Sequence, residues 1–115
     1  MSERREDILA GDFSEAFIEK MKKAIVTSHF KYGWARKTYP DLAQAHKCAK
    51  ERLEEYEKTH NKEYLIDVAN FVMLEFMFPA FADARYIPTD SDKSIGLAGG
   101  ISFKELMENV EAGIE

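Results

Sequence analysis

Polar residues interrupt the apolar stretch from Glu63 to Phe78, and three of them are the residues of this sequence best placed to do chemistry. Glu63, Asp67 and Asn70 are spaced by four and then three residues, which puts their side chains in one line along a helix face. The apolar residues of the stretch point to every side of the helix, as is typical of a buried helix, and the stretch is too short to span a membrane. Because a carboxylate in a core is costly unless paired, hydrogen-bonded or metal-bound, the question is what faces Asp67.

A second helix is expected to lie beside this stretch. Residues 41–58 have helical apolar spacing, and the short break at 59–62 predicts that they fold back on residues 63–78 as an antiparallel hairpin. We therefore expect an all-α fold: a helical bundle organised around this central hairpin.

Folding the hairpin about its turn brings acidic residues of the two helices together. Glu54 comes level with Asp67, and Glu51 comes level with Asn70. Like charges this close need protons or a divalent cation, and oxygen ligands favour Mg²⁺, with Mn²⁺ as the other ion that fits. The alternative is an ion pair between Asp67 and Arg52, with the glutamates of the second helix in solvent.

The remaining segments complete a single domain over residues 1–115. Residues 1–11 are polar and expected to be loosely held, and residues 12–31 have the pattern of a first helix ending before a glycine. A long connection is expected at 79–101, and a capping pattern predicts a short C-terminal helix at 102–113.

The composition excludes some classes of partner. The chain has 115 residues and a net charge of −5, so neither nucleic acid nor an anionic membrane is an expected partner. Cys48 is the one cysteine, and no signal peptide is visible, which fits a cytoplasmic setting. An acidic protein can still bind a phosphorylated ligand through a metal ion.

The sequence also resembles a known family. RLEEY at 52–56 and EYLIDVANFVMLEFMFP at 63–79, with KYG at 31–33 and TDSD at 89–92, resemble the MazG-related all-α nucleoside triphosphate pyrophosphohydrolases over residues 28–96. These enzymes carry Glu-Glu-x-x-Glu on one helix and Glu-x-x-Asp on the next. The resemblance implies a magnesium-dependent hydrolase that releases pyrophosphate and a nucleoside monophosphate, in dimers or tetramers.

The resemblance and the spacing together assign roles to individual residues. Magnesium would be held by four side chains: Glu54, Asp67, Asn70 and Glu63. A free glutamate, Glu51 or Glu55, would accept the proton of the attacking water. Cations of the two connections would bind the phosphates of the substrate: Lys31, Arg36, Arg85 and Lys93.

A second function remains open. Tyr64 stands three residues before Asp67, where the family signature has glutamate, and Lys50 precedes Glu51 where the signature has a glutamate pair. The alternative to the hydrolase is therefore a non-catalytic helical homodimer: a scaffold, or a nucleotide-binding relative that has lost turnover. Either form is expected to be a homodimer or tetramer, because residues 63–78 carry more apolar surface than one small bundle can bury.

Overall fold

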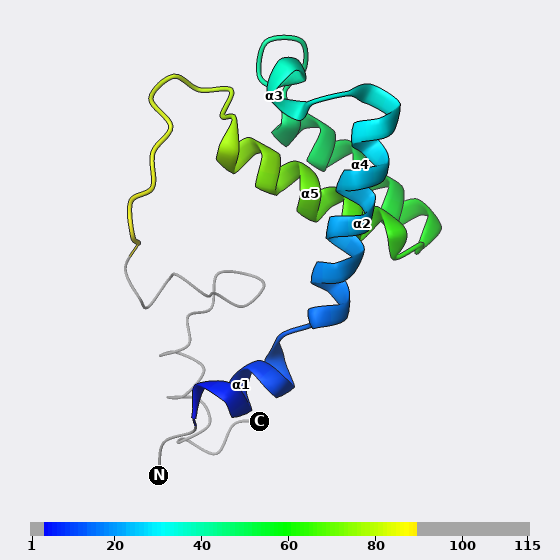
Figure 1. Cartoon of the computed structure of the whole chain (residues 1–115), viewed down its shortest axis with the longest axis vertical. Coiled ribbons are helices and arrows are strands. Elements are labelled where there is room, and N and C mark those ends of the chain that lie inside the picture. The colour runs from blue at the N-terminus through cyan, green and yellow to red at the C-terminus, as the bar shows by residue number, and fades with distance from the viewer. Residues whose placement is uncertain (1–3, 90–115) are drawn as a thin grey trace. The chain divides into compact units, whose positions relative to one another are not determined.

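A computed structural model of the chain describes residues 4–89 (Figure 1). Its helices are α1 (Arg5–Asp12), α2 (Glu15–Tyr32), α3 (Ala35–Thr38), α4 (Ala45–Thr59) and α5 (Glu63–Met77). No strand occurs within residues 4–89, so the all-α class is confirmed for this part of the chain. The expected helix at 102–113 and most of the connection at 79–101 lie outside the described residues.

The chain divides into two compact units, residues 1–84 and 85–115, where the sequence indicated a single domain. The first unit contains all five described helices. Of the second unit, residues 85–89 are described, and they are exposed and without regular secondary structure. Residues 5–11, expected to be loosely held, belong to α1, which has no buried residue.

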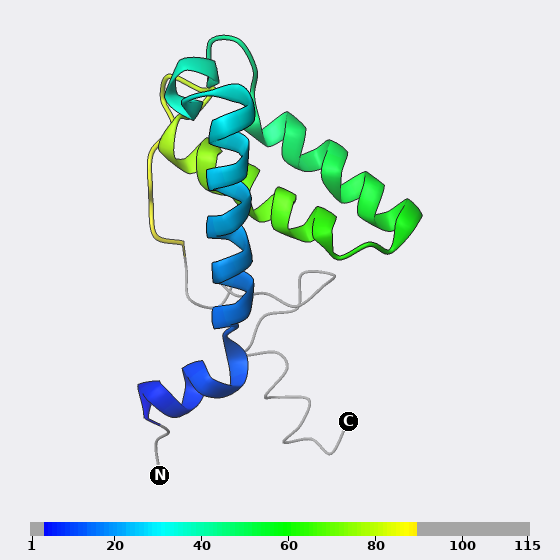
Figure 2. The same ribbon diagram turned by 45° about the vertical axis from the view of Figure 1, so that its right-hand side comes forward.

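The hairpin of α4 and α5 is the centre of the first unit, and the two helices lie side by side in both views (Figures 1 and 2). The turn between the two helices is short because His60 adopts a left-handed conformation with φ of 59°. The N–H of His60 donates to the Tyr56 carbonyl at 2.7 Å. The side chain of Asn61 accepts from the N–H of Glu63 at 3.0 Å and so satisfies a backbone donor at the start of α5.

Helix α2 crosses the hairpin on the side of α5 (Figure 2). It begins where Ser14 caps it, because the Ser14 hydroxyl accepts from the Phe17 N–H at 3.0 Å. It ends at Gly33, whose φ of 85° is accessible to glycine at little cost and whose N–H donates to the His29 carbonyl at 2.8 Å. These two residues fix the segment of α2 that packs on α5.

The core of the described unit is small. The buried apolar side chains are Ala45 and Ala49 of α4 and Ile66 and Leu74 of α5. The two alanines allow the backbone of α4 to approach α5 closely.

Within a single chain helix α5 is only partly buried, as expected from its carrying more apolar surface than one small bundle can bury. Val72 is 55% exposed and Phe76 is 74% exposed. The reason is geometric, because α2 and α4 cover only part of the circumference of α5.

Candidate functional site

Asp67 faces an arginine of the neighbouring helix. Its Oδ2 lies 4.0 Å from Nη1 of Arg52, and the two side chains are 33% and 45% exposed. Arg52 occupies this place because it continues the stripe of Ala45 and Ala49 that faces α5. Burial raises the pKa of the Asp67 carboxyl; Arg52 opposes that rise, and the nearby carboxylate of Glu63 adds to it.

The glutamates of α4 do not gather around Asp67. Glu51 and Glu54 are exposed, and Glu55 is half-buried with its carboxylate 3.7 Å from Nζ of Lys58. Arg52 and Glu54 are two residues apart and therefore point about 200° apart around the helix. With Arg52 toward α5, Glu54 is turned away. Across residues 4–89 no three His, Cys, Asp or Glu side chains lie close enough to share a metal ion.

Asn70 ties α5 to α2. Its side chain is buried, at 6% exposure of the residue, and its Nδ2 donates to the carbonyl of Met21 at 3.1 Å. Its Oδ1 is buried as well and has no hydrogen-bond partner among the described residues. Magnesium ligation by Asn70 stays a prediction, and the observed contact is a helix-packing one.

A groove of about 600 Å³ lies between α2 and the first turns of α5. We call it the lysine groove, because Lys20 and Lys23 of α2 and Lys62 at the start of α5 line it. Glu63 and Asp67 line it too, so two of the four predicted metal ligands share one cavity. Its volume is within the range of small-molecule sites.

The three lysines were missed in the sequence analysis. Lys20 and Lys23 are three residues apart, so they share a face of α2. They also lie within one turn of Phe17 and Ala24, which belong to the apolar side of the helix. Their position beside the apolar side of α2 indicated that these lysines lie near a helix-packing surface. The sequence did not indicate where along its length α2 crosses α5.

The predicted phosphate-binding cations lie apart from the lysine groove or outside its unit. The guanidinium of Arg36 stacks on the ring of Trp34, 4.4 Å from its centroid. Lys31 is exposed at the end of α2 and does not line the groove. Arg85 belongs to the second unit, and Lys93 lies outside the described residues.

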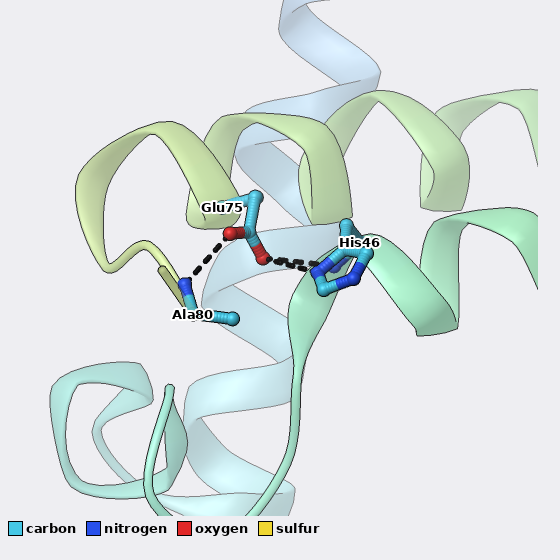
Figure 3. A network of polar contacts seen from close by, with 3 residues as sticks. All are labelled: His46, Glu75 and Ala80. Carbon is cyan, nitrogen blue, oxygen red and sulfur yellow. Dashed lines mark hydrogen bonds and ion pairs between the residues drawn. The ribbon is translucent and has the colours of Figure 1, made fainter. Parts of the chain in front are cut away.

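A second polar cluster, which the sequence analysis also missed, joins the start of α4 to the end of α5 (Figure 3). The Oε1 atom of Glu75 lies 3.0 Å from both the N–H and the Nδ1 of His46, and its Oε2 accepts from the Ala80 N–H at 2.8 Å. Helix α4 has no capping side chain of its own, so Glu75 supplies that acceptor from another helix. The hydrogen bond from Ala80, followed by those from His46, holds the pKa of the Glu75 carboxyl below its usual value.

Residues 4–89 form a helical structure with a lysine-lined groove between α2 and the largely apolar helix α5. Comparison with known proteins adds no assignment, because no family model, curated protein or solved structure matches this chain. The relation to the pyrophosphohydrolases therefore stays a prediction from resemblance. None of the helices within residues 4–89 has the length and apolar character needed to cross a membrane.

Proposed function

We propose that this chain is a nucleotide-binding relative of the all-α pyrophosphohydrolases that holds its ligand without hydrolysing it. The ligand is a nucleoside triphosphate or a related phosphorylated small molecule. It occupies the lysine groove between α2 and α5. The proposed setting is the cytoplasm.

The observation that carries this proposal is the pairing of Asp67 with Arg52. In the catalytic arrangement predicted from the sequence, Asp67 and Glu54 share a cation. Here a guanidinium lies beside Asp67, while Glu51 and Glu54 are exposed on other faces of α4. No glutamate of α4 is among the residues that line the groove, where it could accept a proton from an attacking water.

Magnesium fits the groove as a companion of the ligand. Glu63 and Asp67 are one helical turn apart on α5 and line the same cavity. Magnesium is commonly held by one or two carboxylates together with the phosphates of a substrate, and Mn²⁺ suits the same oxygens. Bound there, the ion would supply positive charge to the phosphate oxygens. Asp67 and Glu63 would position it, and the Arg52 guanidinium beside Asp67 would offset part of the negative charge of that carboxylate.

A magnesium-dependent pyrophosphohydrolase is the second candidate. The presence of Glu63 and Asp67 in one groove with three lysines favours it. In this candidate Glu51 or Glu55 accepts the proton of the attacking water, and the products are pyrophosphate and a nucleoside monophosphate. It requires one of these glutamates to approach the groove.

Self-association is part of the same proposal, as a homodimer or a dimer of dimers. The large exposure of Val72 and Phe76 on α5 supports it. A shallow depression lined by Leu53, Val68 and Val72 runs between α4 and α5 on this side. A second copy that covered this surface would bury the apolar side of α5 that α2 and α4 leave open.

One experiment separates the two candidates. Binding of a panel of nucleoside triphosphates is measured by calorimetry with and without Mg²⁺, and pyrophosphate release is measured in parallel. The proposal predicts binding that Mg²⁺ strengthens and no pyrophosphate above that of the Asp67→Asn variant. Release that depends on Mg²⁺ and is lost in Asp67→Asn establishes the hydrolase instead. Absence of binding to every member of the panel refutes both.

A further inference from the structure

The three lysines of the groove form no ion pair within the described residues. The ion pairs within residues 4–89 join Arg4 to Asp7, His46 to Glu75, Arg52 to Asp67 and Lys58 to Glu55. Lys20, Lys23 and Lys62 form none of them. In a chain with a net charge of −5, the lining of this cavity holds three lysines against the two carboxylates of Glu63 and Asp67, which leaves a net charge of +1.

The walls of the groove also include apolar surface. Phe17 and Ala24 of α2 and Leu65 and Ile66 of α5 contribute apolar surface to it. Phe17 is half-buried, so part of it remains open to a ligand. The cavity thus combines apolar walls with cationic groups, which suits a molecule that has an apolar or planar body and a multiply charged anionic group.

We propose that Lys20, Lys23 and Lys62 bind the phosphates of the ligand directly, while the wall at Phe17 contacts its planar body. Lys20 and Lys23 reach the groove from α2, one turn apart, and Lys62 reaches it from the start of α5, so phosphates between them are contacted from two helices. Divalent cation strengthens this binding without being required for it. The identity of the ligand as a nucleotide rests on the proposed function, whereas the role of the lysines is tested independently of it.

The shared chemistry is a phosphate group on an apolar body, and two sources could supply it: a nucleotide or the phosphate ester of an alkyl chain. Calorimetry in EDTA with ATP, inorganic tripolyphosphate and dodecyl phosphate distinguishes them. We expect tripolyphosphate and ATP to bind in EDTA, with ATP the tighter because of its base, and dodecyl phosphate to bind more weakly than either. Tighter binding of dodecyl phosphate overturns the nucleotide assignment.

The double variant Lys20→Glu/Lys23→Glu tests the lysines. A charged hydrogen bond is worth about a tenfold change in affinity, so the double variant should bind both ATP and tripolyphosphate about a hundredfold more weakly. The matched control is Lys22→Glu/Lys47→Glu, which makes the same change in net charge at two exposed lysines outside the groove lining. This control should keep the affinity within about threefold of wild type, because neither lysine lines the groove and both charges are screened by water and salt.

Three results overturn the inference: no binding of tripolyphosphate to wild type, equal losses in the two double variants, or full affinity in Lys20→Glu/Lys23→Glu. Circular dichroism verifies that each variant is helical, and Lys20→Gln/Lys23→Gln replaces the charge reversal if that variant unfolds. The proposed function fails separately. If tripolyphosphate binds in a lysine-dependent way and no nucleotide binds, the nucleotide is refuted as the ligand, and the assignment of the lysines as a phosphate site is retained.

Discussion

Replacing Glu75 should destabilise this protein more than its place near the end of a helix suggests. The carboxylate accepts from the His46 N–H and contacts its ring nitrogen, each at 3.0 Å, and it accepts from the Ala80 N–H at 2.8 Å (Figure 3). The side chain is only 19% exposed, so water cannot readily replace it. Without it, α4 loses the acceptor for a backbone N–H of its first turn.

The cost follows from these contacts. Loss of a helix N-cap costs about 1 kcal/mol, and loss of a charged hydrogen bond to a backbone N–H costs about 1.5–3 kcal/mol. Glu75→Ala should therefore lower the free energy of unfolding by about 3 kcal/mol, which corresponds to a fall in Tm of roughly 10–20 °C for a domain of this size. Glu75→Gln should cost about half as much, because its amide retains one acceptor oxygen.

The pH dependence has a definite sign. Because the pKa of Glu75 is lowered in the folded protein, its contribution is present above the unfolded value of about 4.3 and is lost as pH falls through the folded value. Between pH 5 and pH 3 the wild type should therefore lose more stability than Glu75→Gln, in which this group no longer titrates.

Urea denaturation followed by circular dichroism measures both effects. The control is Glu57→Gln, an exposed glutamate of α4 whose replacement should change the free energy of unfolding by less than about 0.5 kcal/mol. Equal stability of Glu75→Ala and wild type, or parallel pH profiles for wild type and Glu75→Gln, would refute the assignment of Glu75 as the cap of α4.

Three further predictions concern α5. Asp67→Asn should leave the free energy of unfolding at pH 7 unchanged within about 0.5 kcal/mol or raise it, since the raised pKa of Asp67 means that folding favours the uncharged carboxyl; a loss above about 2 kcal/mol in urea denaturation would contradict this. Asn70→Ala should lose about 1 kcal/mol with the Met21 hydrogen bond and keep Mg²⁺ binding by calorimetry, whereas loss of Mg²⁺ binding would put Asn70 in the ion's shell. Phe76→Asp should be a helical monomer by light scattering where wild type is a dimer, and a monomeric wild type at micromolar concentration would refute self-association.

Local features were predictable from the sequence because neighbouring residues decide them. The stop at Gly33 and the break before α5 each depend on residues within one helical turn, and each lies where the pattern indicated. The start of the first helix differs, because it was expected at residue 12 and α2 begins at Glu15, after the cap at Ser14. The hairpin followed from the short break between two apolar patterns.

The candidate site depended on the rotation of helices, which spacing along the chain does not determine. Counting from the turn placed Glu54 level with Asp67, yet the alanine stripe of α4 turns Arg52 toward α5. The lysines of α2 reach the groove only because α2 crosses α5. Glu75 is 29 residues from His46 in sequence, and nothing local indicated that contact.

The account is tested most directly by following the backbone amide signals of the full chain by NMR during titration with ATP and Mg²⁺. We expect the largest shift changes along the lysine groove, at Phe17, Lys20, Lys23, Glu63 and Asp67, with unchanged nucleotide at the end of the titration. Changes confined to residues 30–39, or no changes at all, would contradict binding in the groove. Conversion of the ATP to AMP and pyrophosphate would contradict the loss of turnover.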